Sequence, residues 1–375
     1  MKSTNLIKPL FLAALILGGI LITSSCETNS SMENNSSLIS LKQAYKDYFP
    51  IGVAVSPSNF KDSLERGLIL EQFSSITAEN VMKAGPIHPE IDRYNWEQAD
   101  QVANFAREHG LKLRGHALIW HQQYPKWFFK DQDGNRISKD TLYARMRSHI
   151  HTVVNRYKDI VYAWDVVNEA VSDSIHKIHR ESSPFYQIAG KEYLVKAFEF
   201  AKEADPNALL YYNDYNAVRP GKVNRIHSLL QQMIEDGAPI DGVGIQGHWS
   251  IYEPSKDELT SALDLYSSLG LEVQITELDV SLYRWEKHQR PLKEGENKGF
   301  TDSLEQKQIA QYEAIFEVFR NYKDVLTGVT FWNISDRYSW LDHYPVEGRK
   351  NYPLLFDTEL QPKKVYRKVV NFNQE

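Results

Sequence analysis

Short apolar runs alternate with amphipathic segments along most of the chain. Eight runs have the length and the β-branched or aromatic content of buried strands. They cover 51–55, 73–79, 111–120, 161–169, 208–216, 243–249, 271–279 and 326–334. Helical spacing occurs between them, at 97–109, 142–157, 192–204, 222–236, 256–269 and 304–321. Alternating strands and helices predict a parallel sheet, and eight such units favour one closed α/β barrel, a (β/α)8 or TIM barrel, over an open doubly wound sheet.

Helix-ending residues and the lack of internal linkers support a single domain. A glycine or an Asp-Pro pair stands where four predicted helices should stop, at Gly110, Asp205-Pro206, Gly237 and Gly270. No Gly/Ser-rich or Pro-rich break interrupts 41–375, so we expect these residues to form one (β/α)8 domain. The chain has 375 residues, 42% of them apolar, which suffices for one large barrel.

The N-terminal segment has a different character. Two lysines precede the apolar run 10–22, which is short for a membrane span and typical of a signal peptide. Small residues then lead to Cys26, the single cysteine, in a pattern that resembles a bacterial lipoprotein box. We expect 1–25 to be a lipoprotein signal peptide, Cys26 to carry the lipid and 26–40 to be a flexible tether. The protein would then be anchored in the bacterial cell envelope, on the periplasmic or the cell-surface face, and would contact the membrane through this anchor only.

Composition and charge narrow the choice of partner. The formal net charge is −6 and no run of Lys or Arg forms a basic patch, which argues against nucleic acid held through its phosphates. No glycine-rich phosphate-binding motif follows the first strand. The 8 Trp, 21 Tyr and 16 Phe fill a large core and also suit a cleft in which sugar rings stack. We expect a neutral polymer as the substrate, no cofactor and a monomeric protein.

Polar and ionisable residues collect at the carboxyl end of nearly every predicted strand. They are Glu79-Asn80, His116, Asn168-Glu169, Asn213-Asp214, Gln246 and His248, Glu277 and Asp279, and Trp332-Asn333. In barrel enzymes this face of the barrel holds the active site.

Two of these residues are carboxylates that end apolar strands. Glu169 ends the fourth strand and Glu277 ends the seventh, so the two should face each other across the barrel mouth. Such a pair suits hydrolysis of a glycosidic bond, because one carboxyl can protonate the leaving oxygen while the other attacks the anomeric carbon. Their mutual repulsion raises the pKa of one relative to the other. The sequence does not fix their separation, so it leaves retention and inversion of configuration both open.

Six motifs together resemble those of the glycoside hydrolase family 10 xylanases, in that family's order and spacing over 41–370. They are ITAENVMK (76–83), LRGHALIWHQQ (113–123), AWDVVNEA (163–170), VGIQGHW (243–249), ITELDV (275–280) and TFWNISDRYSW (330–340). The resemblance implies a (β/α)8 barrel that acts as an endo-1,4-β-xylanase on xylan and xylo-oligosaccharides, with retention of configuration.

The resemblance also implies a role for each matching residue. Glu169 would be the general acid/base and Glu277 the nucleophile. The supporting residues would be Asn168 at the sugar 2-hydroxyl, His248 orienting the nucleophile, Asp279 beside it, and Gln246 near the acid/base. The sugar-binding residues would be Glu79, Asn80, Lys83, His116, Trp120, Trp332 and Trp340, the first three on the non-reducing side.

Some local alternatives stay open. Glu79 and Lys83 could instead form an i,i+4 ion pair on a helix. Asn333 stands where the family usually has glycine, which leaves the backbone beside Trp332 undecided. The loop 283–300 is longer than a minimal member needs and is expected to shape the leaving-group side of the cleft. The histidines lack the spacing of a metal site, so no metal is expected.

Two alternative functions also stay open. The same barrel could be a β-1,4-glucanase or a glycanase of mixed specificity. It could also be a lipoprotein that binds xylan without cutting it.

Overall fold

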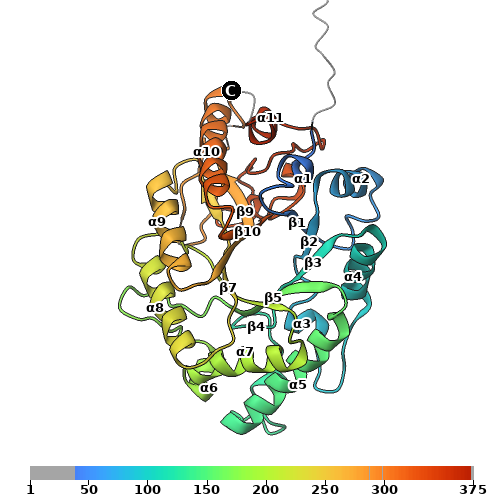
Figure 1. Ribbon diagram of the computed structural model, residues 1–375, viewed down its shortest axis with the longest axis vertical. Coiled ribbons are helices and arrows are strands. Elements are labelled where there is room, and N and C mark those ends of the chain that lie inside the picture. The colour runs from blue at the N-terminus through green and yellow to red at the C-terminus, as the bar shows by residue number, and fades with distance from the viewer. Residues whose placement is uncertain (1–38, 287, 298, 373–375) are drawn as a thin grey trace, which may run out of the picture. The chain divides into compact units, whose positions relative to one another are not determined.

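Eight parallel strands form a closed barrel in the computed structural model, which describes residues 39–286, 288–297 and 299–372 (Figure 1). The barrel strands are β1 (Ile51–Val55), β2 (Ser75–Ala78), β3 (Lys112–Gly115), β5 (Val161–Asn168), β6 (Leu209–Asp214), β7 (Gly242–Ile245), β9 (Glu272–Ser281) and β10 (Leu326–Phe331). Neighbours pair in this order, and β10 closes the ring by pairing with both β9 and β1. The predicted (β/α)8 barrel is confirmed, and β5 and β9 are its fourth and seventh strands.

Helices connect the strands and surround the barrel (Figure 1). The longer ones are α2 (Ser63–Gln72), α4 (Glu97–His109), α5 (Lys139–Tyr157), α7 (Glu192–Ala204), α8 (Lys222–Glu235), α9 (Lys256–Ser267) and α10 (Asp302–Asn321). Shorter ones are α1 (Leu41–Ala44), α3 (Ala84–Ile87), α6 (Pro184–Ala189) and α11 (Lys364–Val370), with 3-10 turns η1 (Lys126–Phe128), η2 (Asp336–Tyr338) and η3 (Trp340–Asp342).

The predicted helices are all present, and their stop signals act as expected. Gly110, Gly237 and Gly270 follow α4, α8 and α9 with φ of 64°, 85° and 75°, the left-handed conformation that glycine adopts most easily. Helix α2 was not predicted. Its sequence contains a glycine and the exposed Leu64, which weaken the apolar stripe of an amphipathic helix.

Two short strands extend the barrel at its carboxyl end. Strand β4 (Ile119–Trp120) pairs with β5 and sets Trp120 opposite Asn168. Strand β8 (His248–Ser250) pairs with β9 and sets His248 opposite Asp279. These pairings bring residues that are distant in the sequence to the rim of the barrel.

A buried ion pair lies inside the barrel. Arg114 and Asp165 are 1% and 0% exposed, and Arg114 Nη2 donates to Asp165 Oδ1 at 2.6 Å. Arg114 Nε also donates to Gln274 Oε1 at 2.9 Å. Beside the pair, a Cβ on Gly115 would lie 2.1 Å from the ring of Trp164, so only glycine leaves room for that indole.

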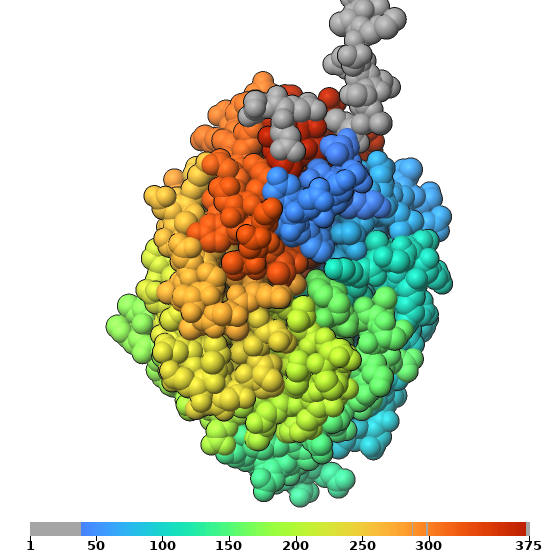
Figure 2. All heavy atoms as spheres, in the orientation of Figure 1, coloured from blue at the N-terminus to red at the C-terminus, as the bar shows by residue number. Residues whose placement is uncertain are grey.

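The two ends of the described chain meet where the barrel closes. Tyr45 donates to the carbonyl of Val369 at 2.7 Å, and Tyr366 donates to that of Ile39 at 2.8 Å. Figure 2 shows the blue N-terminal elements packed beside the orange and red C-terminal ones. None of the helices within the described ranges is both long and apolar enough to cross a membrane. The predicted signal peptide, Cys26 and nearly all of the predicted tether lie outside the described residues.

Candidate active site

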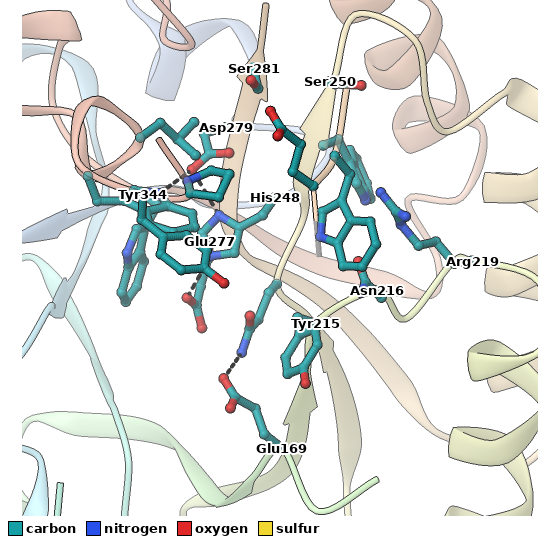
Figure 3. Close-up of a pocket in the computed structure, with 18 of the residues that line it drawn as sticks. Glu169, Tyr215, Asn216, Arg219, His248, Ser250, Glu277, Asp279, Ser281 and Tyr344 are labelled. Atoms are coloured by element: carbon teal, nitrogen blue, oxygen red, sulfur yellow. Dashed lines mark hydrogen bonds and ion pairs between the residues drawn. The ribbon is translucent and has the colours of Figure 1, made fainter. Parts of the chain in front are cut away.

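A cavity of about 980 Å³ opens at the carboxyl ends of the strands, and both predicted carboxylates line it (Figure 3). Glu169 directly follows β5, and Glu277 lies within β9. Their exposed fractions are 8% and 5%. A carboxylate buried to this extent needs hydrogen bonds or an opposite charge, so the neighbours of each glutamate decide which one is ionised.

Glu277 is surrounded by hydrogen-bond donors. His248 Nε2 lies 3.1 Å from its Oε2, and Asn213 Nδ2 donates to its Oε1 at 3.0 Å. The other ring nitrogen of His248, Nδ1, lies 2.8 Å from Asp279 Oδ2, which also accepts the indole N–H of Trp340 at 2.8 Å. An imidazole between two carboxylates donates to both only when both of its nitrogens carry protons.

The charges of Asp279, His248 and Glu277 shift the pKa values of His248 and Glu277 in opposite directions. Burial would lower the pKa of His248, but the charge and hydrogen bond of Asp279, and then those of Glu277, raise it to about 10. Burial would raise the pKa of Glu277, but the hydrogen bond from His248 and the surrounding positive charges leave it below its ordinary value. At neutral pH, therefore, Glu277 is ionised and His248 is a cation.

Glu169 accepts hydrogen bonds from neutral donors. Gln246 Nε2 donates to its Oε1 at 3.0 Å, and Trp120 Nε1 donates to its Oε2 at 2.8 Å. Burial raises the pKa of Glu169 above its ordinary value; the two hydrogen bonds oppose this rise, and the charges of Asp214 and Glu277 add to it. The pKa of Glu169 is thus raised and that of Glu277 lowered, so one carboxyl can act as an acid while the other is ionised.

A buried network holds the turn that carries Glu169. The residue has φ of 58°, in the left-handed region, so the turn needs support. The next two peptide N–H groups donate to the hydroxyl of Tyr212 at 3.0 and 3.1 Å. Tyr212 donates in turn to Asp214, whose other carboxylate oxygen accepts from Lys222 Nζ at 2.8 Å. Arg180 Nε donates to the carbonyl of Glu169 at 2.9 Å.

One amide connects the two halves of the site. Asn213 Nδ2 donates to Asn168 Oδ1 and to Glu277 Oε1, both at 3.0 Å, and its Oδ1 accepts from Thr276 at 2.7 Å. A Cβ on Gly244 would lie 2.3 Å from Asn213 Oδ1, so glycine makes room for this amide. Because Asn168 Oδ1 accepts from Asn213, the Nδ2 of Asn168 remains as a donor at the cavity wall.

Five of the seven predicted sugar-binding residues line the cavity. They are Lys83, His116, Trp120, Trp332 and Trp340. The other two, Glu79 and Asn80, lie outside its lining but stay close to Lys83, which donates to Asn80 Oδ1 at 2.9 Å.

The alternative of a helical ion pair between Glu79 and Lys83 is wrong. Residues 79–83 form bends and turns rather than a helix, and no ion pair within 4.0 Å joins the two side chains. Lys83 Nζ lies instead 5.0 Å from the centre of the Trp120 ring. The geometry of a strand end, not that of a helix face, brings these residues together.

Two tryptophans form one wall of the cavity. The ring of Trp332 lies 5.6 Å from that of His116, and the ring of Trp340 lies 4.9 Å from that of His248. Asn333 has φ of 140°, a backbone that favours glycine. The chain thus keeps the glycine-like conformation at this position although it carries a side chain there.

The sequence did not assign a role to four residues of the site. Asn213 and Asp214 were recognised as a polar pair at a strand end, and that signal could have led to them. Tyr212 and Arg180 give no such signal, because their importance lies in backbone groups that they bind after the chain has folded.

The paired carboxyls define a class of protein. Within the described ranges, no group of three or more His, Cys, Asp or Glu side chains is arranged to hold a metal ion. A carboxyl of raised pKa and an ionised carboxylate line one cavity at the catalytic face of a (β/α)8 barrel, the arrangement of a glycoside hydrolase.

Comparison with known proteins identifies the family. The chain belongs to glycosyl hydrolase family 10, whose sequence model matches residues 40–372. It is 45% identical to endo-1,4-beta-xylanase A of Caldicellulosiruptor saccharolyticus, over 89% of this chain and 96% of that protein. The crystal structure of xylanase XynB from Paenibacillus barcinonensis superimposes with a TM-score of 0.85 at 43% identity, covering 89% of this chain and 99% of that one. A mutant structure in complex with xylotriose gives a TM-score of 0.84 at 43% identity, covering 89% and 100%.

Proposed function

We propose that this protein is an endo-1,4-β-xylanase that hydrolyses internal β-1,4-xylosidic bonds of xylan with retention of configuration. Its similarity to proteins named as xylanases, over most of its length, supports the substrate. The observation that carries the mechanism is the contrast between the two carboxyls. Glu277 is paired with the cationic His248, whereas Glu169 is buried among neutral donors.

The reaction proceeds in two displacements. In the first, the carboxylate of Glu277 attacks C1 of the xylose on the non-reducing side while Glu169 gives its proton to the glycosidic oxygen. The C1–O bond breaks and the reducing-side fragment leaves. The sugar that remains is bound covalently to Glu277 as a xylosyl-enzyme. In the second, Glu169 takes a proton from water as the water oxygen attacks C1. The bond between C1 and Glu277 breaks, the non-reducing-side fragment leaves with its configuration retained, and both carboxyls are regenerated.

The neighbouring residues position these two groups. Asn168 donates from Nδ2 to the sugar 2-hydroxyl, a bond that strengthens as positive charge develops at the sugar. His248, held by Asp279, orients and stabilises the carboxylate of Glu277. Gln246 fixes the carboxyl of Glu169.

The sugar on the non-reducing side is bound at the other predicted residues. Lys83, with Glu79 and Asn80 beside it, binds its hydroxyls together with His116, and Trp120 covers this end of the cleft. Trp332 and Trp340 cover the sugars next to the cleaved bond and leave no room for the hydroxymethyl group that distinguishes glucose from xylose. A single group of this kind discriminates by about 1–3 kcal/mol.

The test is release of reducing sugar from xylan and from carboxymethylcellulose by the full chain. We expect fast release from xylan, little from carboxymethylcellulose, and almost none in Glu277→Gln. Glu108→Gln, an exposed glutamate on α4, is the matched control and should retain full activity. Comparable rates on both polymers would identify a glucanase or a mixed glycanase. Binding of xylan without hydrolysis would identify a non-catalytic binder.

A second measurement tests the role of Glu169. Glu169→Ala should lose activity on xylan and keep much of its first-step rate on an aryl β-xylobioside, because an activated phenol leaves without a proton. Equal loss on both substrates would contradict the assignment of Glu169 as the acid.

We further propose that the protein is a monomeric lipoprotein, lipidated at Cys26 and held in the bacterial cell envelope. The charged and apolar N-terminal segment and the small residues before Cys26 support this proposal. Metabolic labelling with an alkyne-tagged fatty acid should mark the wild type and not Cys26→Ser. Protease accessibility in intact cells reports on which face of the membrane the protein lies. Light scattering of the isolated domain 41–375, in buffer without detergent, reports its oligomeric state.

A further inference from the structure

The loops opposite the non-reducing side carry an excess of positive charge. Strands β6 and β7 lie across the barrel from β2, next to which the predicted non-reducing-side contacts lie. The segments that follow β6, β8 and β9 line the cavity with four cationic and two anionic side chains: Arg219, Lys222, Arg225 and Arg284 against Glu253 and Glu286. The chain as a whole has a formal net charge of −6, so the positive charge of these segments is opposite in sign to that of the whole protein.

Most of these cations have partners in the protein. Arg219 pairs with Glu253, and Lys222 pairs with Asp214. Arg225 donates to two backbone carbonyls. Arg284 is different, because within the described residues its guanidinium makes neither an ion pair nor a hydrogen bond, only a contact with the ring of Tyr252 at 4.2 Å.

A second cation shares this ring. Lys307, on α10, places its Nζ 5.6 Å from the centre of the Tyr252 ring, and the described carboxylates form no ion pair with it. Two cations near one aromatic ring, neither of them paired with a described carboxylate, leave a local positive charge that an anionic group would neutralise. We call Arg284, Lys307 and Tyr252 the Tyr252 cluster.

Two exposed aromatic rings, one in the cluster and one next to Arg284 in the sequence, suit a sugar. Tyr252 is 40% exposed, and Trp285, which follows Arg284, is 46% exposed. The guanidinium of Arg219 lies 4.4 Å from the centre of the Trp285 ring, and both residues line the cavity. Figure 3 shows Arg219 with Asn216 and Tyr215, which line the same cavity. Flat rings bind the apolar faces of sugars, and a guanidinium with unoccupied N–H groups binds a carboxylate through two parallel hydrogen bonds.

We propose that the Tyr252 cluster binds the carboxylate of a uronic acid side chain carried by the xylan on the leaving-group side of the cleft. The inference rests on the proposed xylanase function and adds the kind of decoration that the enzyme prefers. Arg284 holds the carboxylate, Lys307 adds charge, and Tyr252 keeps both cations in place.

The experiment compares glucuronoxylan with the same polymer after its uronate carboxyls have been reduced to alcohols. The two substrates share backbone and branching and differ in charge alone. The full-length wild type, Arg284→Gln, Lys307→Gln and the double variant are assayed at low and high salt, and the ratio of kcat/KM for the acidic polymer to that for the reduced polymer is recorded. Arg147→Gln, an exposed arginine on α5 outside the cavity, is the matched control.

We expect the ratio to exceed one in the wild type and to fall about two- to fivefold in each single variant, the size of an exposed ion pair. It should fall further in the double variant, stay unchanged in Arg147→Gln, and approach one in the wild type at about 0.5 M salt. An equal ratio in the wild type and the double variant at low salt would overturn the proposal.

A measurement of polymer binding distinguishes failure of the uronate-binding proposal from failure of the xylanase function on which it rests. Retardation of the native protein in gels that contain either polymer measures affinity without turnover. If no variant cuts either polymer, the xylanase function fails, but stronger retardation of the wild type than of the double variant by the acidic polymer still supports the Tyr252 cluster. Equal retardation refutes it.

Discussion

Asp279→Asn should change the pH range over which the enzyme works. The carboxylate of Asp279 lies 2.8 Å from Nδ1 of His248, and its charge is the largest single influence that favours the imidazolium. Asparagine keeps the size of the side chain and removes that charge. The pKa of His248 should fall, and the pKa of Glu277, which loses a cationic neighbour at neutral pH, should rise.

The size of the effect follows from the pKa of His248. The rise from the ordinary 6.5 to about 10 corresponds to about 5 kcal/mol in favour of the imidazolium. Asp279 and Glu277 supply this energy against the opposing effect of burial, and the side chain of His248 is only 19% exposed, so solvent screens it little. Without the charge of Asp279, burial and a single carboxylate remain, and we expect the imidazole to be mostly neutral above neutral pH.

An activated aryl β-xylobioside isolates this effect. Its first step needs an ionised Glu277 and no acid, so kcat/KM should rise as Glu277 ionises and fall only as His248 loses its proton. For the wild type the alkaline fall should lie near pH 10. For Asp279→Asn it should move toward neutral pH, while Asp279→Glu restores much of the wild-type profile. Identical alkaline limits in the wild type and Asp279→Asn would refute the reasoning.

Three further predictions concern the acid, the core and a strained turn. Asp214→Asn should lower the pKa of Glu169, because a like charge is removed, so the alkaline limit of kcat/KM on xylan should move to lower pH; an unchanged limit would exclude this coupling. Arg114→Met leaves Asp165 buried without its partner and should lower the free energy of unfolding by about 3–5 kcal/mol in urea titrations, and a loss below about 1 kcal/mol would contradict it. Asn333→Gly should raise the free energy of unfolding by about 1 kcal/mol by relieving the φ of 140°; calorimetry that finds no gain would show that the asparagine is not strained.

The alternation of strands and helices was enough to predict the barrel. Each apolar run overlaps one barrel strand, although the runs 111–120 and 243–249 divide and also contribute to the short strands β4 and β8. The closed ring follows from the number of alternating units. The same pattern marked the carboxyl halves of the strands: Glu169 directly follows β5 as expected, whereas β9 continues to Ser281 and so extends past Glu277, which was expected to end it. These features are local, so the sequence displays them directly.

The supporting network could not be predicted in the same way. The contact of Tyr212 with the turn after Glu169 joins a side chain of β6 to backbone groups that follow β5, and no periodicity in the sequence predicts such a contact. The helical pairing of Glu79 with Lys83 was plausible from spacing alone and wrong in space, because the chain turns after β2 instead of coiling. Helix α2 escaped prediction because Ile69 is its one buried apolar residue, so the sequence shows no apolar stripe there.

The amide of Asn213 lets the positions of the two acids be fixed independently of the loops that shape the cleft. It donates to Glu277 and to the residue before Glu169, and Thr276 fixes which of its ends is oxygen, so the spacing of the two acids is set inside the barrel. Loops at the rim can then lengthen, gain charge or exchange aromatic residues while the distance that determines the stereochemical outcome stays constant. A lineage can in this way adapt to a new plant polymer through its loops alone, and a change of stereochemistry would require rebuilding the core.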